Sequence, residues 1–493
     1  MKLGIDFGTC YSFPAVLRNG IPTSLLTYGG NVGIPSVFYY DSETKEQVGW
    51  NAEEYGGEHP ENMVSNIKSV ILKSKTYVLG GKNFSTTEIC SQILKNIVQT
   101  AEDEAGIRFE EAVISIPVHF GAGERRILTE AALVPKDKGG PGLLAVEFIQ
   151  EPVAAALSYA EQYVDVNDRY ILVYDMGGGT FDAALIQRTD DLDPPYKVID
   201  FEGCKIGGND FDQLLFNYLK DSYESEYGLS ISHKRDRFEL MKTARTVKEK
   251  LSGRDQTAAE YHHNDGRVMR YTVTRAKFEE LISEKVDATV WMMEELARKH
   301  DLLTKDGKLV SWARLIMVGG SSLIPSIKMK LAEKLGTEKD RIRIYQPDRA
   351  IAFGAARYAE ENDILMRISP YSYGVRAYFN NEPHIINLIK YKDELPICSK
   401  WEKFMTRQPN QKAVGFDVYE NYSTDVKTPL DGTKEKRKLM TVILEFNHEV
   451  PQGTLVKAQL VMDAKGNLSV RAQDPSKKDS QVEEKCNIRY SWE

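Results

Sequence analysis

Apolar residues recur in two different patterns along the chain, and the pattern changes near residue 362. Before that point, several segments carry apolar residues at helical spacing, and short apolar runs that read as strands lie between them. The helical segments are 86–104, 124–133, 151–161, 211–226 and 275–300, and the runs include 111–116, 170–174 and 314–318. Alternating helices and strands predict an α/β body over residues 1–362.

After residue 362, short strand-like segments are separated by turn residues. These segments are 372–379, 384–389, 414–419, 438–446, 455–462 and 467–473. They predict a compact β-sandwich over residues 371–493. A linker at 363–370, which contains the apolar residues Ile364, Leu365 and Met366, joins it to the body.

The α/β body contains a repeat. An apolar strand runs into the turn Asp-Phe-Gly-Thr, which begins at Asp6, and another runs into Asp-Met-Gly-Gly-Gly-Thr, which begins at Asp175, 169 residues later. A second apolar strand follows each turn, at 11–17 and at 181–186. Two copies of one pattern at this separation predict two like lobes that face each other.

These turns suggest phosphate chemistry. Glycine lets backbone N–H groups approach phosphate oxygens, and an aspartate before the turn can hold a hydrated Mg²⁺ ion. No Gly-Lys-Ser/Thr follows, so the turns are not P-loops. Two ordinary hairpins are the alternative, but two turns in register favour a nucleotide site. The Gly-Gly segment 318–325 would also let a nucleotide approach closely, and 347–356 reads as a tightly packed small-residue helix.

Composition and charge exclude several classes of function. Hydrophobic residues make up 42% of the 493 residues, which suits large cores and about three domains. The net charge is −8, and its acidic excess lies before Leu365, because the later residues carry 20 Lys and Arg against 17 Asp and Glu. An acidic body argues against a nucleic-acid partner. The basic run at 434–438 reads as a solvated hairpin loop.

Targeting and metal signals are weak. No apolar run is long enough to cross a membrane, and the first residues carry no export signal. The five scattered cysteines suit a reducing compartment, so we expect a cytoplasmic chain. The adjacent His262 and His263 read as an exposed loop pair rather than as metal ligands.

The order of the motifs resembles that of the seventy-kilodalton heat-shock chaperone family, the DnaK-like chaperones. The segments that carry the resemblance are 5–12, 151–157, 174–182, 207–212, 274–281, 318–325 and 347–356, and more loosely 451–453 and 462–474. The resemblance implies an actin-like, ribonuclease H-like nucleotidase of two lobes around a Mg-ATP cleft. A small β-sandwich that binds peptide would follow this domain.

The resemblance also implies roles for single residues. The catalytic residues would be Asp6, Lys68, Glu151, Asp175 and Asp182, with Asp6 and Asp175 holding Mg²⁺ through water. The nucleotide-binding residues would be Gly8, Thr9, Cys10, Tyr11, Gly177, Gly178, Gly179, Thr180, Gly207, Gly208, Lys248, Ser252, Gly319, Gly320, Ser321, Leu323 and Asp348. Taken alone, Lys68 reads as a surface lysine, and Glu151 as the cap of the helix that follows it.

Two further pairs of residues concern switching and peptide binding. Pro117 and Arg125 fall where the family relays nucleotide state to the second domain, although Pro117 alone reads as a proline that ends a buried strand. Phe404 and Val414 would line a peptide groove, whereas each alone reads as a core residue.

Several positions depart from the family pattern. Arg245 stands where the family usually has Glu, and Glu249 where it has Arg or an apolar residue. Leu323 replaces the Arg that stacks on adenine, which removes a cation–π interaction. Arg367 follows the linker in place of Asp, and Arg407 lies near the position of a small apolar residue in the peptide arch.

We therefore expect a lidless, chaperone-like ATPase with slow turnover, since phosphoryl transfer needs mainly positioning and charge neutralisation. Without the family's helical lid, bound peptide should exchange quickly. The expected ligands are ATP or ADP and Mg²⁺, with K⁺ as a second candidate ion. The expected partners of the monomeric chain are unfolded or extended polypeptide, or one dedicated protein, together with J-domain and nucleotide-exchange co-chaperones.

Three other functions stay open. A non-enzymatic, ATP-sensing regulator with one dedicated partner is favoured by the divergent β-domain. Small-molecule kinases share the actin-like fold, and fold alone does not decide between them and a chaperone. A filament-forming relative of actin is the weakest alternative, because such subunits seldom need a C-terminal domain of this kind.

Overall fold

The computed structural model describes residues 1–25, 33–72, 76–163, 168–189, 193–361, 364–431, 436–476 and 481–485. The chain is mixed α/β with several sheets and divides into two compact units. The first unit comprises Met1–His119, Ile127–Asp190 and Phe201–Asn362, and the second comprises Phe120–Arg126, Asp191–Asp200 and Asp363–Glu493. The expected boundary at 362–363, residues 434 and 435 of the basic run and Cys486 lie outside the described residues. Arg437 and Lys438 begin the strand Arg437–Val450, so the expectation of a hairpin loop is wrong for these two residues.

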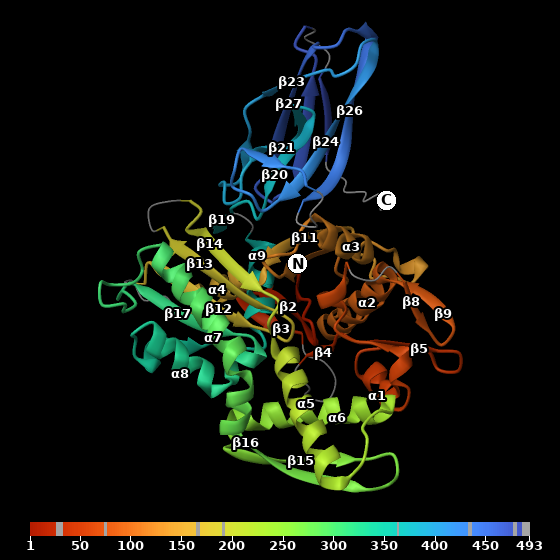
Figure 1. Ribbon diagram of the computed structural model, residues 1–493, viewed down its shortest axis with the longest axis vertical. Coiled ribbons are helices and arrows are strands. Elements are labelled where there is room, and N and C mark those ends of the chain that lie inside the picture. The colour runs from red at the N-terminus through yellow and green to blue at the C-terminus, as the bar shows by residue number, and fades with distance from the viewer. Residues whose placement is uncertain are drawn as a thin grey trace. The chain divides into compact units, whose positions relative to one another are not determined.

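Two sheets of the first unit repeat one arrangement (Figure 1). The first sheet runs in the order β11 (Ala145–Gln150), β10 (Glu111–Ile116), β1 (Leu3–Asp6), β2 (Tyr11–Arg18) and β3 (Ile21–Ser24), with β4 (Ile34–Pro35) also on β2. The second contains, in order, β18 (Ile342–Ile344), β17 (Ala313–Val318), β12 (Tyr170–Met176) and β13 (Phe181–Arg188). In both, the strand that carries the aspartate is antiparallel to the next strand in the chain and parallel to its other neighbour.

The described part of the first unit also contains α-helices, some against these sheets and some against the smaller ones. They are α1 (Trp50–Glu58), α2 (Thr86–Ala105), α3 (Ala122–Ala132), α4 (Glu151–Tyr163), α5 (Gly208–Tyr227), α6 (Lys234–Gly253), α7 (Arg275–Lys299), α8 (Pro325–Lys334) and α9 (Ala350–Glu360). Local chemistry sets their ends. The Ser85 hydroxyl accepts the Glu88 N–H while the Glu88 carboxylate accepts the Ser85 N–H, so α2 begins at a capping box. It ends at Gly106, whose φ is 68°.

Helices α4 and α9 pack through small residues. A Cβ atom at Gly354 of α9 would fall 1.7 Å from the carbonyl oxygen of Ala154 in α4. A Cβ atom at Gly4 of β1 would fall 2.2 Å from the backbone nitrogen of Ala356 in α9. Because neither glycine leaves room for a side chain, α9 approaches both α4 and the first sheet at backbone distance.

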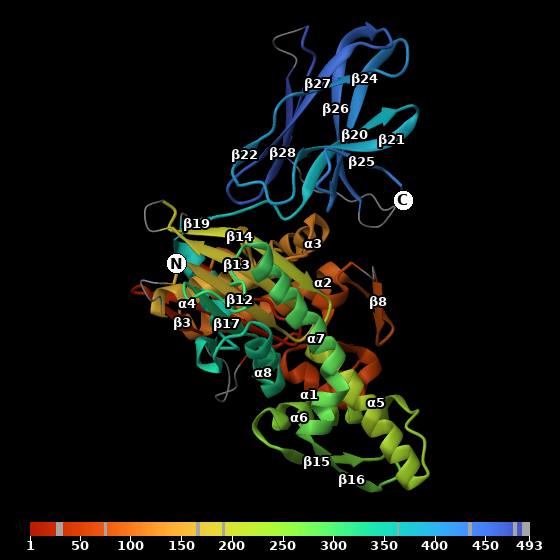
Figure 2. The same cartoon turned by 60° about the vertical axis from the view of Figure 1, so that its left-hand side comes forward.

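The remaining strands of the first unit form small sheets. They are β5 (Phe38–Asp41), β6 (Lys45–Val48), β7 (Met63–Val64), β8 (Thr76–Leu79), β9 (Lys82–Ser85), β15 (Gln256–His262) and β16 (Val268–Thr274). Figures 1 and 2 show the hairpin of β15 and β16 gathered with α5 and α6. His262 ends β15, whereas the His263 side chain is only 9% exposed and its Nδ1 lies 2.9 Å from an Asp265 oxygen. The expectation of an exposed loop pair is therefore wrong for His263.

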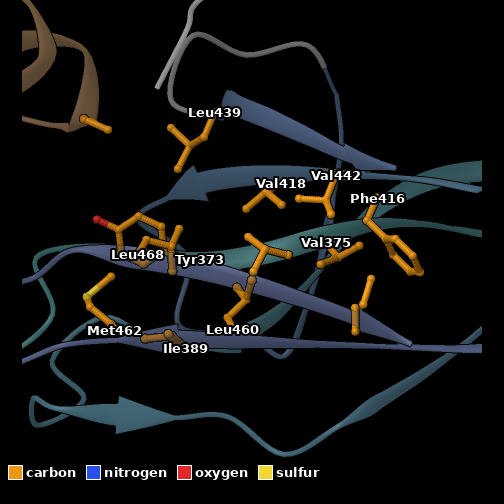
Figure 3. Packing of buried hydrophobic residues seen from close by; sticks show 14 of the residues in the cluster. Tyr373, Val375, Ile389, Phe416, Val418, Leu439, Val442, Leu460, Met462 and Leu468 are labelled. Carbon is orange, nitrogen blue, oxygen red and sulfur yellow. The ribbon is translucent and has the colours of Figure 1, made fainter. Parts of the chain in front are cut away.

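The second unit contains two packed sheets. One runs β25 (Lys427–Pro429), β21 (Glu382–Ile389), β20 (Ser372–Phe379), β24 (Gln411–Asn421) and β26 (Arg437–Val450). The other runs β22 (Ile397–Cys398), β27 (Leu455–Met462), β28 (Leu468–Gln473) and β29 (Val482–Lys485), with β23 (Glu402–Met405) also on β27. Figure 3 shows the core between them, where Val375, Val418 and Val442 of one sheet meet Leu460 of the other.

Two earlier segments of the chain complete the second unit. Only residues 196–200 of strand β14 (Tyr196–Cys204) belong to the second unit, and Tyr196 lies opposite Leu365 of the parallel strand β19 (Leu365–Met366). Part of the expected linker is thus a short strand. Among the described helices, none is long and apolar enough to cross a membrane.

The segment Phe120–Arg126 is held by polar contacts within the second unit. The carboxylate of Glu420, on β24, accepts the Ala122 N–H at 3.2 Å. Arg437 Nη1 lies 3.1 Å from Glu124 Oε2 and 3.7 Å from Glu420 Oε1. Burial raises the pKa of Glu420 to about 7, against the opposing effect of Arg125 and Arg437. The start of α3 is therefore capped by a carboxylate from a distant strand.

Candidate functional site

A cleft of about 540 Å³ opens in the first unit beside the turns that follow β1 and β12. The first turn is tight. A Cβ atom at Gly8 would fall 1.9 Å from the Tyr11 carbonyl oxygen, so the position requires glycine. Ser36 braces the turn, since its hydroxyl donates to the Gly8 carbonyl and its N–H to the Cys10 carbonyl, both at 2.8 Å. These contacts use carbonyl groups and leave backbone N–H groups for an anion.

The second turn is supported by two other glycine segments. The Gly208 N–H donates to the Gly177 carbonyl at 2.9 Å, which places the start of α5 against the turn. A Cβ atom at Gly207 would lie 2.7 Å from Gly178, and one at Gly319 would lie 2.4 Å from the Met176 carbonyl oxygen. Three separate segments thus meet at backbone distance, which explains why all three carry glycine.

Acidic side chains and one lysine gather at one end of the cleft. Lys68 and Glu151 form an ion pair and are 3% and 6% exposed. Asp175 and Asp182 lie directly opposite each other on β12 and β13, and both are buried. Asp6 is buried as well and accepts a hydrogen bond from the Ser115 hydroxyl at 3.0 Å.

The electrostatics of this end favour a bound cation. Burial raises the pKa of Glu151 and of Asp6, while Lys68 opposes both shifts. Burial raises the pKa of Asp175 well above its usual range, and the carboxylates of Glu151 and Asp182 add to the effect. One lysine does not balance four carboxylates, and a hard divalent cation such as Mg²⁺ prefers oxygen ligands. The donor set of Asp6 and Asp175 therefore fits Mg²⁺.

The other end of the cleft is less polar. Leu323, Ile324 and Ile351 contribute apolar side chains to its lining. Beside them, Lys248 Nζ lies 2.8 Å from Asp212 Oδ1 and Arg245 Nε lies 3.4 Å from Asp212 Oδ2. Apolar walls with a few convergent polar groups are typical of a small-molecule site, and this end suits a base and its sugar.

Most of the residues expected to bind nucleotide lie together. Those that line the cleft are Asp6, Gly8, Thr9, Cys10, Tyr11, Lys68, Glu151, Asp175, Gly177, Gly178, Thr180, Lys248, Ser252, Gly319, Gly320, Ser321, Leu323 and Asp348. Gly179, Gly207, Gly208 and Asp182 are absent from this lining. The two glycines of 207–208 pack behind the second turn, and Asp182 lies close enough to Glu151 and Asp175 to raise their pKa values.

Other lining residues were not singled out from the sequence. They are Phe13, Asn209, Ile324, Pro347 and Ile351. Asn209 follows two glycines at the start of a helix. This position in the sequence could have identified it as a residue that lines the cleft. Ile324, Pro347 and Ile351 lie within the segments 318–325 and 347–356, which carried the resemblance although these residues were not named. Phe13 is an apolar residue of an expected strand, with no signal of its own.

The residues assigned to switching lie on one stretch of chain. Pro117 follows β10 directly, and the next N–H, that of Val118, donates to Asp182 Oδ1 at 2.9 Å. Arg125 belongs to the second unit, where its guanidinium donates to the Tyr373 hydroxyl at 3.4 Å. Their role as a relay stays a prediction.

The residues assigned to a peptide groove pack against the sandwich core. Phe404 and Val414 are partly buried there, and the rings of Phe404 and Phe416 lie 5.8 Å apart. Arg407 stacks on the ring of Tyr378, with its guanidinium carbon 3.6 Å from the ring centroid. An exposed cation therefore lies near the position where the resemblance implies a small apolar residue.

One comparison with known proteins bears on the chain. A family model described as Hsp70 protein matches residues 72–491. The match includes Glu151, Asp175 and the second unit's strands, and it begins just after Lys68.

Proposed function

Because the chain belongs to the Hsp70 family, we propose that it is a chaperone-like ATPase in which slow hydrolysis of Mg-ATP controls polypeptide binding by the sandwich. Members of this family are ATPases that bind ATP with Mg²⁺ and bind unfolded polypeptides. The fold would be the family's actin-like, two-lobed nucleotidase followed by a β-sandwich. The observation that carries the proposal is the buried Lys68–Glu151 pair at the acidic end of a glycine-lined cleft.

The cleft residues would have separate roles in this reaction. The glycine turns after β1 and β12 offer backbone N–H groups to the phosphates. Asp6 and Asp175 would hold Mg²⁺, and the ion would supply positive charge for the phosphates. Lys68 adds a second positive charge. Glu151 orients the attacking water, with Asp182 close behind it, so that catalysis rests on positioning and charge neutralisation.

The sandwich is proposed to take extended polypeptide near Phe404 and Val414, with J-domain and nucleotide-exchange proteins as partners of a cytoplasmic monomer. Arg407 over Tyr378 differs from the small apolar residue expected there. This difference favours a narrow set of clients, so a dedicated protein partner is the second candidate.

Single-turnover ATP hydrolysis tests the proposal. We would compare the wild type with Lys68→Ala and Glu151→Gln, each with and without an unfolded model peptide. Lys95→Ala and Glu104→Gln are matched controls, because both residues are exposed on α2. We expect hydrolysis to fall by a factor of about 100 or more in the first two variants, and peptide to change the wild-type rate.

Two results would overturn the proposal. Tight ATP binding without hydrolysis, indifferent to peptide, would identify an ATP sensor with a dedicated partner. Transfer of the γ-phosphate to an added sugar or polyol, rather than to water, would identify a small-molecule kinase.

A further inference from the structure

A histidine lies beside the acidic end of the cleft and has no part in the mechanism above. His119 follows Pro117 and Val118 after β10, and its Nδ1 lies 3.7 Å from Asp182 Oδ1. The Asp182 side chain is 1% exposed and that of His119 is 21% exposed. The pair is therefore mostly shielded from solvent, where a charge has a stronger effect than at the surface.

Asp182 is held on one oxygen only. Its Oδ1 accepts the Val118 N–H at 2.9 Å, and a Cβ atom at Gly203 would lie 2.9 Å from the same oxygen, so the backbone closes tightly around it. Its Oδ2 is buried and has no hydrogen-bond partner among the described residues. One oxygen is thus fixed by the His119 segment, and the other is left for a ligand such as water.

The surroundings of the pair are acidic. The carboxylates of Asp175, on β12, and Glu151, at the start of α4, interact with that of Asp182, as does the Cys204 thiol on β14. Asp6 and Lys68 belong to the same cluster, since both affect the pKa of Glu151 and of Asp175. A positive charge on His119 would consequently strengthen its contact with Asp182. Histidine is the side chain whose charge changes in the range of about pH 5 to 8.

We propose that His119 is a positioning residue for hydrolysis: as imidazolium it fixes Asp182 Oδ1, so that Asp182 Oδ2 can orient the attacking water. The inference rests on the proposed ATPase function and adds a residue to it. His119 is also the last residue of its segment in the first unit, and Phe120 begins a segment of the second. The chain therefore passes directly from this contact to the residues that the sandwich holds.

The test is the pH profile of single-turnover hydrolysis, measured on the preformed complex with Mg-ATP between pH 6 and 8. Protonation of the nucleotide and of metal-bound water affects every variant equally. A difference between variants in the ratio of the rates at pH 6 and pH 8 therefore comes from the protein. We expect this ratio to be about threefold or more lower in His119→Gln than in the wild type. His119→Lys keeps a cation at all these pH values, so its rate at pH 8 should rise toward the wild-type rate at pH 6.

Two controls separate positioning from a structural effect. His233→Gln changes an exposed histidine and should leave the ratio as in the wild type. In an Asp182→Asn background, His119→Gln should change the ratio no further, because the partner is already neutral. Thermal unfolding of each variant checks that it is folded.

The outcomes are distinct for the two proposals. If the wild type hydrolyses no ATP at any pH, the proposed function fails. If the wild type hydrolyses ATP but its profile superimposes on that of His119→Gln, the ATPase stands and the role of His119 is wrong. The same conclusion follows if His119→Gln lowers the rate equally at all pH values.

Discussion

Gly354 lies against the main chain of Ala154, so closely that a Cβ atom on Gly354 would fall 1.7 Å from the Ala154 carbonyl oxygen. The two residues belong to α9 and α4, and α9 also meets Gly4 of the first sheet at backbone distance. Helix α4 begins with Glu151 of the acidic cluster. A change in the packing of these two helices would therefore move Glu151, which lies at the start of α4.

Gly354→Ala should destabilise the first unit. Overpacking against a backbone atom costs about 1–3 kcal/mol, and the gain in helix propensity offsets up to about 1 kcal/mol of this. We expect the free energy of unfolding, measured in urea, to fall by about 1–2 kcal/mol, and ATP affinity to fall with it. Gly253→Ala is the matched control, because nothing lies within 4 Å of its added Cβ atom. Equal stability of the two variants would contradict the close contact.

Leu323→Arg should raise the affinity for ATP. Leu323 lines the less polar end of the cleft and is 45% exposed. An arginine there can stack on the base, and a cation–π interaction contributes about 0.5–2 kcal/mol. Isothermal titration calorimetry should show a Kd lower by a factor of about 2–30. Met329→Arg adds the same charge on α8 and should leave Kd unchanged; a similar gain in both variants would point to net charge instead.

Cys10 should alkylate slowly despite its place in the cleft. Burial raises the pKa of its thiol, against the opposing effect of Arg245 and Lys248, so little thiolate forms near neutral pH. Timed iodoacetamide labelling followed by mass spectrometry should show Cys398, which is exposed, reacting first. Buried Cys90 provides the slow reference, since burial raises its pKa to about 12. Labelling of Cys10 as fast as that of Cys398 would support a redox-sensitive nucleotide site.

Glu420→Gln should change how stability depends on pH. The pKa of Glu420 is raised to about 7 in the folded protein, so the folded state keeps this proton at pH values where the unfolded chain has lost it. The associated stability is present at acidic pH and is lost as pH rises through about 7. The variant should therefore gain on the wild type between pH 5 and pH 8, by up to about 3 kcal/mol.

Unfolding temperatures at the two pH values measure this difference. Glu402→Gln, at an exposed position on β23, is the control and should follow the wild type. If the unfolding temperatures of the wild type and Glu420→Gln change equally with pH, the pKa of Glu420 is not raised in the folded protein.

Features set by neighbouring residues were the predictable ones. The paired turns after β1 and β12 follow from glycines within a few positions of an aspartate, and the capping box at Ser85 is equally local. The β15–β16 hairpin was not predicted, although buried Ala259, Tyr261 and Met269 alternate with exposed residues along it, which is a strand pattern.

Features that depend on distant residues were not predictable from local pattern. Lys68 alone reads as a surface lysine, yet it is buried because Glu151, 83 positions away, neutralises it. Asp212 likewise joins Arg245 and Lys248 across helices α5 and α6. Asp182 lies outside the cleft lining because of how two sheets and α4 pack together. This packing cannot be predicted from the spacing of residues along the chain.

The bond from Ala122 to Glu420 joins residues 298 positions apart, and this has a consequence for biosynthesis. At roughly 5–20 residues per second, translation takes on the order of 15–60 s to pass from one to the other. During that interval the Gly121 N–H can already bond to the nearby Glu124 carboxylate, but the Ala122 N–H lacks its Glu420 partner. The nascent chain must therefore wait for β24 before this helix start acquires its native partner, and a chaperone-like protein would itself pass through an exposed intermediate on the ribosome.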